Sequence, residues 1–482
     1  MINVRPALHV LGMLIVMLAI GMLVPMLADI AVGNPDWQVF LLAAVLTASL
    51  GGMLFLANRG MENELKLRQA FLLTTFAWMF LPAFAALPFV FSELGLGYTD
   101  AYFEAMSGLT TTGATILSGL DTAPPGILIW RSLLQWFGGI GVIVMTVAIL
   151  PMLQVGGMQL FKTESFDTSE KIMPRAEQIS SAITGIYVAL TAICMVLLMF
   201  GGMGPFDAIA HAMTTIATGG FSTKDASIGH FDSATIDTIV IFFMIIGSLP
   251  FVLYIQFLRG RTLAIWRDEQ VRAFLGVVLF LVVMVTLWLT LFKDYDFGSA
   301  LRFGSFNIIS ILTGTGYATF DYGGWGSFAV TMFFFVMFIG GCAGSTSCGI
   351  KIFRFQVMFK AFSTWKARML MPNGVFLARF NGRTISPVII SSVMSFFTFF
   401  IISFFVLSVA VAATGVDWVT ALSGVGSAIA NVGPGLGNII GPSGSYAPLP
   451  DAAKWILAFT MLFGRLELFT ILVIFTRAFW KH

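Results

Sequence analysis

Long apolar segments recur along the whole chain, and they restrict its fold more than any other feature of the sequence. Each holds about 20 mostly apolar residues, the length that an α-helix needs to cross the hydrocarbon core of a bilayer. Of the 482 residues, 58% are hydrophobic and only 10% are charged, whereas soluble domains carry about 25% charged residues. The sequence therefore predicts an all-α polytopic membrane protein.

The apolar segments predict ten membrane spans, of which the eighth is interrupted. They cover residues 7–28, 38–57, 69–91, 126–152, 180–201, 235–258, 271–292, 325–362, 385–413 and 452–477. The first run is longer than the apolar region of a signal peptide and has no convincing cleavage site, so we interpret it as a retained helix. Four shorter, half-polar segments of about ten residues begin near Tyr98, Pro205, Gly298 and Trp418, and they are too short to span.

The distribution of Lys and Arg predicts the orientation of the spans. One set of loops carries Arg59, Lys66, Arg68, Lys162, Lys171, Arg175, Arg259, Arg261, Arg267, Arg272, Lys351, Arg354, Lys360, Lys366, Arg368, Arg379 and Arg383. The opposite loops hold few basic residues and most of the acidic ones. We therefore expect the basic loops and both termini on the cytoplasmic side, and the four short segments outside. An acidic outer face would concentrate cations at a pathway; a solvated rim without that role is the alternative.

Each short segment lies between two spans and is followed by a polar turn. Non-helical backbone at membrane depth is tolerated only where it is buried in protein or lines a water-filled cavity. Four such segments in one chain therefore predict re-entrant loops that share one pathway.

Four similar sequences follow the short segments, about 100 residues apart. They are LTTTGAT (109–115), IATGGFS (216–222), LTGTGYA (312–318) and IANVGPG (429–435). In this alignment Gly113, Gly220, Gly316 and Gly433 coincide. The match extends upstream, where EAMSG (104–108) aligns with HAMTT (211–215). Each repeat is therefore a span–loop–span unit.

Such loops have the chemistry of a cation filter. A cation that enters a membrane exchanges its hydration shell for oxygens, which inward-turned backbone carbonyls can supply. That turn needs dihedral angles that glycine tolerates, and short helices would point their negative ends at the ion. For one loop alone, small-residue helix packing is the alternative, but four equivalent loops favour a pseudo-fourfold filter. Its candidate residues are Thr111, Thr112, Gly113, Thr218, Gly219, Gly220, Gly314, Thr315, Gly316, Asn431, Val432 and Gly433.

The four loops resemble degenerate copies of the potassium-channel filter on one chain, an arrangement similar to the Trk/Ktr/HKT superfamily of potassium uptake proteins. The ten spans resemble the bacterial TrkH branch, from about residue 38 onward. The resemblance implies potassium uptake across the bacterial inner membrane, a homodimer, and a cytoplasmic nucleotide-binding regulatory ring (TrkA-like). Potassium would be the substrate, with no cofactor in this chain and the nucleotide on the partner. The implied units are residues 1–68, 69–152, 180–258, 270–362 and 384–478.

In that family, glycine at the key position of every repeat goes with potassium selectivity, and serine in the first repeat goes with sodium. Gly113, Gly220, Gly316 and Gly433 satisfy the potassium pattern. Gly219 and Pro434 depart from the strict consensus, which favours a less sharply selective filter.

A second motif, GGCAGSTSCGIK (340–351), interrupts the eighth span. Glycine costs about 1 kcal/mol relative to alanine inside a helix, so we expect a break; a kink without a role is the alternative. TrkH-like proteins carry a matching glycine-rich loop across the pore. Its candidate gate residues are Gly340, Gly341, Ala343, Gly344, Ser345, Thr346, Ser347, Gly349 and Lys351.

Three charged or titratable residues fall within apolar surroundings. Arg465 lies inside the last span, where arginine is expensive; the resemblance places it in the ion path as part of the gate, and pairing with Glu467 or snorkelling is the alternative. Arg131 is expected to be an interfacial anchor. His211 aligns with Glu104, and we favour a hydrogen bond to neighbouring backbone over proton coupling.

Two other functions were weighed against a pore. A proton- or sodium-coupled potassium symporter would usually show inverted repeats, whereas these repeats are parallel. A membrane enzyme would need clustered carboxylates, a His/Cys constellation or a metal site, which the sequence lacks, so no enzyme is predicted. The basic segment 351–383 is the expected docking site of the partner, with attraction to anionic lipid as the alternative.

Overall fold

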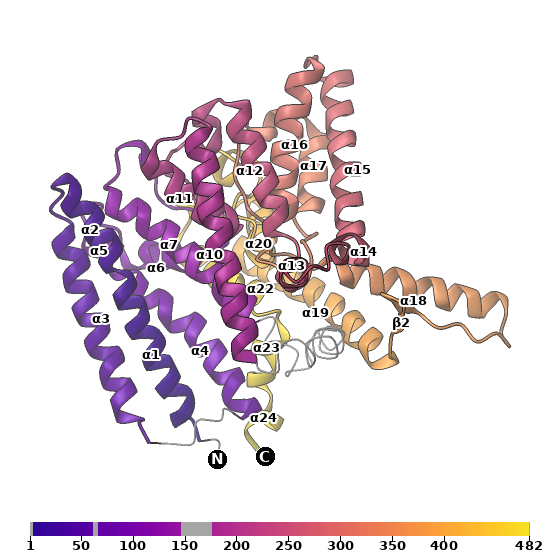
Figure 1. Ribbon diagram of the computed structural model, residues 1–482, viewed down its shortest axis with the longest axis horizontal. Helices are drawn as coiled ribbons and strands as arrows, with labels where there is room; N and C mark the ends of the chain where they lie inside the picture. The colour runs from indigo at the N-terminus through magenta and orange to yellow at the C-terminus, as the bar shows by residue number, and fades with distance from the viewer. Residues whose placement is uncertain (1–2, 61–65, 146–175, 482) are drawn as a thin grey trace.

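The computed structural model describes residues 3–60, 66–145 and 176–481. Within these ranges the chain is helical apart from one short hairpin, formed by β1 (Arg379–Phe380) and β2 (Arg383–Thr384). The start of α1 and helix α24 lie at the same end of the molecule (Figure 1). The predicted basic loop that holds Lys162, Lys171 and Arg175 lies outside the described residues.

An N-terminal group of helices packs at one side of the molecule (Figure 1). It consists of α1 (Arg5–Gly21), α2 (Leu23–Val32) and α3 (Trp37–Ala57). A Cβ added at Gly12 would lie 2.5 Å from the backbone nitrogen of Phe55, and one at Gly51 would lie 2.8 Å from the Ile15 side chain. The absence of side chains at these glycines therefore allows α1 and α3 to pack closely.

The rest of the chain repeats one pattern four times: a long helix, a short helix, a loop and a return helix. The first copy holds α4 (Leu67–Ala85), α5 (Leu87–Phe91), α6 (Tyr98–Leu109) and α7 (Pro125–Val144); the second holds α10 (Ala176–Phe200), α11 (Pro205–Ile216), α12 (Ala234–Gly247) and α13 (Phe251–Leu258). The third holds α15 (Glu269–Phe292), α16 (Phe297–Thr313), α17 (Ser327–Val336) and α18 (Ile352–Leu370); the fourth holds α19 (Pro387–Ala412), α20 (Trp418–Ala430), α22 (Asp451–Arg465) and α23 (Phe469–Leu472).

Short elements complete the described chain. They are the helical turns η1 (Leu120–Thr122), η3 (Ser227–Phe231), η4 (Tyr322–Trp325) and η5 (Val473–Phe475), and the helices α14 (Ala264–Arg267), α21 (Gly437–Ile440) and α24 (Arg477–Lys481). The four short helices α6, α11, α16 and α20 begin within one residue of the predicted starts. We call them the pore helices.

Seven helices in the described part of the chain are long and apolar enough to cross a membrane, and nine spans result if each bent pair counts as one. Two spans that we predicted as continuous are bent. The segment 235–258 turns by 94° between α12 and α13, and the segment 452–477 turns by 103° between α22 and α23. The prediction 126–152 is described only to residue 145, and α7 ends at Val144.

Local chemistry explains both bends. Pro250 precedes α13, and proline lacks the N–H that would continue the ladder and disfavours helical backbone at the preceding residue. At the second bend, Glu467 and Leu468 have φ of +56° and +52°, a left-handed region that interrupts a right-handed helix. The eighth span is interrupted as predicted, because α17 ends at Val336 and α18 begins only at Ile352.

Candidate ion pathway

The four pore helices end in the same way. In each, the N–H of the residue before the aligned glycine donates to a carbonyl five residues earlier, at 2.9–3.0 Å. These bonds are Thr112 to Ser107, Gly219 to Thr214, Thr315 to Ser310 and Val432 to Ser427. In each loop, the N–H of the preceding residue also donates to a carbonyl three residues earlier. The two bonds together form a Schellman motif, which requires a left-handed residue just past the helix.

Two positions of every loop have left-handed backbone. The residue that follows the helix has φ of +52° at Thr111, +50° at Thr218, +74° at Gly314 and +50° at Asn431. Two residues later, φ is +84° at Gly113, +74° at Gly220, +82° at Gly316 and +107° at Gly433. These four loops therefore have the turned backbone that the sequence predicts for carbonyls directed at an ion.

The four aligned glycines form a closed circle. A Cβ added to each would lie 2.8 Å or less from the carbonyl oxygen that precedes the aligned glycine of the next repeat. The added Cβ of Gly113 would contact the carbonyl oxygen of Gly219, that of Gly220 the oxygen of Thr315, that of Gly316 the oxygen of Val432, and that of Gly433 the oxygen of Thr112. Tertiary structure thus brings together eight of the twelve predicted filter residues in one ring of contacts.

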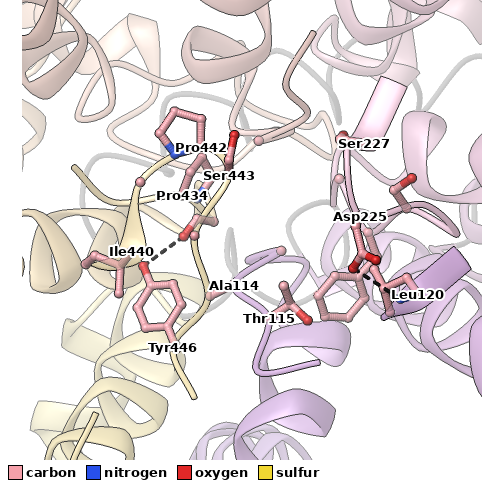
Figure 2. A pocket seen from close by; sticks show the side chains of 18 of the residues that line it. Ala114, Thr115, Leu120, Asp225, Ser227, Pro434, Ile440, Pro442, Ser443 and Tyr446 are labelled. Atoms are coloured by element: carbon pink, nitrogen blue, oxygen red, sulfur yellow. Dashed lines mark hydrogen bonds between the residues drawn. The ribbon is translucent and has the colours of Figure 1, made fainter. Parts of the chain in front are cut away.

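A pocket of about 80 Å³ lies against these glycines (Figure 2). All four line it, together with Lys224, Asp225 and Tyr446. The loop that follows α21 closes one side, because the N–H of Tyr446 donates to the Thr115 carbonyl at 2.9 Å. The pocket therefore gives access to the ring of glycines from the side opposite the C-terminal ends of the pore helices.

A polar side chain of each pore helix braces the loop beyond its glycine, which the sequence analysis missed. Glu104 accepts from the N–H of Ile116 at 2.8 Å, Asn307 accepts from the N–H of Thr319 at 3.3 Å, and Ser423 accepts from the N–H of Leu436 at 2.9 Å. His211 contacts the Ser222 hydroxyl at 2.8 Å. Glu104, His211 and Asn307 lie nine residues before their glycines. A polar residue at the same position of these three repeats was therefore the feature of the sequence that could have predicted the contacts.

His211 is held by hydrogen bonds at both ring nitrogens. Its Nδ1 lies 2.8 Å from the Asp207 carbonyl, so Nδ1 donates and Nε2 accepts from Ser222. The bond to neighbouring backbone is the one that we favoured from the sequence.

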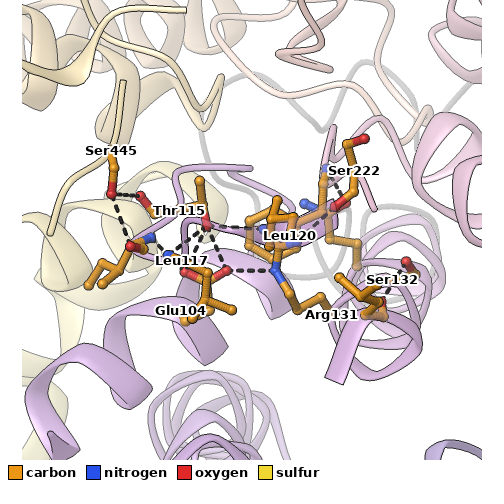
Figure 3. Close-up of polar contacts among 12 residues, drawn as sticks. Glu104, Thr115, Leu117, Leu120, Arg131, Ser132, Ser222 and Ser445 are labelled. Atoms are coloured by element: carbon orange, nitrogen blue, oxygen red, sulfur yellow. Dashed lines mark hydrogen bonds and ion pairs between the residues drawn. The ribbon is translucent and has the colours of Figure 1, made fainter. Parts of the chain in front are cut away.

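Arg131 is not an interfacial anchor, which corrects our prediction. Its side chain is 1% exposed, and its Nε donates to Glu104 at 2.8 Å (Figure 3). Its other nitrogens donate to the Ser222 carbonyl and the Thr115 hydroxyl. The guanidinium therefore joins the first and second filter loops, and the buried carboxylate offsets its charge.

Gln135 makes a second link between these two repeats, also missed from the sequence. Its amide donates to the Gly219 carbonyl at 2.6 Å and accepts from the N–H of Phe221 at 3.0 Å. The side chain of α7 thereby clamps the second loop on both sides of Gly220.

The glycine-rich loop lies at the C-terminal ends of the pore helices. Thr346 donates to the carbonyls of Ile216 and Gly247, at 3.0 and 2.9 Å, and Ser347 donates to the carbonyl of Thr313 at 2.6 Å. All nine predicted loop residues except Gly349 are buried. The loop thus lies against the C-terminal ends of the second and third pore helices.

Arg465 contacts this loop. Its Nη1 donates to the Cys348 sulfur at 2.8 Å and its Nη2 to the Gly138 carbonyl at 3.2 Å, while Nε has no partner within the described ranges. Glu467 pairs with Arg354 instead, so the alternative of an Arg465–Glu467 pair is wrong. Cys348, absent from our predicted gate residues, also lies 3.5 Å from the Thr111 hydroxyl.

This architecture defines a class: a multi-pass membrane protein in which four re-entrant loops from one chain surround a single axis. Residues 36–481 match the family model of TrkH, described as a cation transport protein. The chain belongs to the TrkH family, which confirms both the predicted all-α fold and the prediction that the protein is not an enzyme.

Individual relatives match over their whole length. The Trk system potassium uptake protein TrkI of Halomonas elongata is 43% identical over 99% of this chain and 97% of the relative. TrkH of Escherichia coli K12 is 41% identical over 99% of both chains. The crystal structure of the potassium transporter TrkH from Vibrio parahaemolyticus superposes with a TM-score of 0.92, at 35% identity and 100% coverage of both chains.

Proposed function

We propose that this protein takes up potassium across the bacterial cytoplasmic membrane through a channel-like pore. The closed circle of Gly113, Gly220, Gly316 and Gly433 carries the proposal, because it sets backbone oxygens from four loops around one axis. Carbonyl oxygens in such a ring replace the hydration shell of a cation. The names of the relatives, potassium uptake proteins, support potassium as the ion.

Substitution of Gly113 by serine tests the filter. Its Cβ would be forced against the Gly219 carbonyl at a φ of +84°, so the ring must widen or distort. We expect the wild type to restore growth of an uptake-deficient bacterial host at low potassium. Growth with Gly113→Ser should no longer depend on potassium in this way. Gly324→Ala, where a Cβ meets nothing within 4 Å, is the control. Growth with Gly113→Ser that depends on potassium as in wild type would contradict the proposal.

We further propose that the loop 340–351 and Arg465 form the gate. The loop lies beneath the filter, and a buried guanidinium without a carboxylate partner repels cations more strongly than one in water. Because Arg465 and Cys348 are in contact, opening requires both to move. Potassium flux through Arg465→Ala in proteoliposomes tests this assignment.

A cytoplasmic nucleotide-binding ring, in our proposal, controls the gate by docking on residues 351–383. Helix α18 leads from the gate loop and projects from the body of the molecule (Figure 1). The hairpin after it is tied to α15, because Asn381 bonds to Glu269 and Asp268 while Lys360 pairs with Glu269. Burial raises the pKa of the Asp268 carboxyl. A force on α18 would thus reach both the gate loop and the start of α15.

Charge reversal at the exposed residues Lys366 and Arg368 tests the docking site. We expect the double variant to lose co-purification with its cytoplasmic partner, because the basic surface that the partner meets is inverted. Retained co-purification, with loss only of binding to anionic vesicles, would favour the lipid alternative. The homodimer, the cytoplasmic position of both termini and the five-unit division remain part of the same proposal.

A further inference from the structure

The carbonyl oxygens of the four filter loops are not equivalent. In the part of the chain that the structure describes, the carbonyls of Gly113, Gly220 and Gly316 accept no hydrogen bond. The aligned carbonyl of Gly433 accepts two, from the Ser427 hydroxyl at 2.8 Å and from the Tyr446 hydroxyl at 2.9 Å; Figure 2 shows the bond from Tyr446. A carbonyl oxygen has two lone pairs, so Gly433 has none left for an ion.

The second bond is not needed to satisfy a buried polar group. One donor suffices to avoid the cost of an orphaned carbonyl, and Ser427 already supplies it. In the third repeat, Ser310 occupies the position of Ser427 but donates to Tyr317, one residue past the glycine, at 2.7 Å. In the fourth repeat the residue after the glycine is Pro434, whose ring fixes φ. There the Ser427 hydroxyl donates to the Gly433 carbonyl instead.

Tyr446 is held in position by burial, a ring contact and a backbone hydrogen bond. It is 3% exposed, its ring packs on Phe103 at a centroid distance of 5.4 Å, and its N–H bonds to Thr115 of the first loop. Tyr446 therefore belongs to the fourth repeat, whereas its backbone N–H is hydrogen-bonded to the first. Such a position has little freedom to turn away when an ion enters.

We propose that Tyr446 is a specificity-determining residue, which occupies the Gly433 carbonyl and leaves only three of the four aligned glycine carbonyls free to bind an ion. Selectivity for potassium over sodium depends on the number and field strength of the coordinating carbonyls. A ring with three oxygens supplies fewer ligands than the large, weakly hydrated ion needs. Tyr446 thus lowers the discrimination of the filter at this level. The inference rests on the proposed filter.

Removal of the hydroxyl alone tests the inference. Tyr446→Phe keeps the ring packing and leaves Ser427 on the carbonyl, so the loop stays satisfied while one lone pair becomes free. We expect the potassium-to-sodium permeability ratio, measured from reversal potentials in planar bilayers, to rise about threefold or more. Tyr102→Phe is the control, because it loses an equivalent bond to the Met79 carbonyl on α4, outside the filter. An unchanged or lower ratio in Tyr446→Phe overturns the inference.

Two parallel variants separate the possible failures. Ser427→Ala frees the other lone pair and also removes the oxygen that accepts from the Gly433 N–H at 3.0 Å. We expect it to raise the ratio as well, which carries the test if Tyr446→Phe fails to fold. Gly113→Ser, measured in the same way, reports on the filter itself. If Gly113→Ser changes the ratio and neither hydroxyl variant raises it, the filter stands and the role of Tyr446 is wrong. If Gly113→Ser leaves the permeability ratio unchanged, both the proposed filter and the role of Tyr446 are wrong.

Discussion

Individual residues of the four loops differ at the position two before the aligned glycine, where the backbone is left-handed in every repeat. Thr111 and Thr218 are β-branched yet have left-handed backbone, at a cost of about 1–2 kcal/mol each. In the third repeat this residue is Gly314, and there Cys348 of the gate loop would lie 3.3 Å from an added Cβ. The gate loop thus packs closest where the filter has no side chain to displace.

Also at the residue scale, the Glu104–Arg131 pair makes a prediction about stability. Arg131→Met leaves a buried carboxylate without its cation, and we expect it to cost about 3–5 kcal/mol of unfolding free energy. Adding Glu104→Gln should recover more than half, because the amide oxygen still accepts from Ile116. Unfolding in detergent, analysed as a double-mutant cycle, measures the coupling. Purely additive losses would show that the pair does not act as a unit.

At the scale of elements, broken helices gather around the ion path. Helices α12, α17 and α22 each end beside the gate loop or Arg465 rather than crossing in one piece. Helix ends leave carbonyls without intrahelical partners, and the loop uses them: Thr346 bonds to Gly247 at the end of α12. The break after α12 therefore supplies an acceptor that holds the loop 340–351 in place.

The gate makes a prediction at the same scale. In Arg465→Ala, the buried cation and its bond to Cys348 are both lost, so we expect a higher potassium leak through the closed protein in proteoliposomes, on the order of tenfold for a barrier change of about 1.4 kcal/mol. Arg261→Ala, an exposed arginine outside the proposed docking segment, is the control. A leak equal to or below that of wild type would refute the gate.

At the scale of the whole molecule, the filter exists only when all four repeats are folded together. Each glycine faces an oxygen of the next repeat, and the fourth returns to the first. Arg131 and Gln135 tie the first repeat to the second, and Asn431 of the fourth bonds to Thr112 at 2.9 Å. Ion binding at the proposed filter would therefore be linked to global folding.

That linkage predicts stabilisation by the transported ion. A ligand that binds only the folded state adds about 2.7 kcal/mol at a concentration 100 times its Kd. We expect the melting temperature in detergent to rise with potassium more than with sodium at equal ionic strength, and Gly113→Ser to abolish the difference. Equal shifts with both salts in the wild type would indicate a general salt effect and no selective site.

The sequence by itself predicted most of the spans and the four aligned glycine positions that we propose as the filter. Apolar length predicts the spans, and the shared register of the loops locates Gly113, Gly220, Gly316 and Gly433, because both depend on local composition and spacing. Only the tertiary structure decided the partners of the polar groups. It placed Arg131 on Glu104, Arg465 on Cys348 and Tyr446 on Gly433. These contacts join residues 27, 117 and 13 positions apart, and they follow from how the repeats pack against one another.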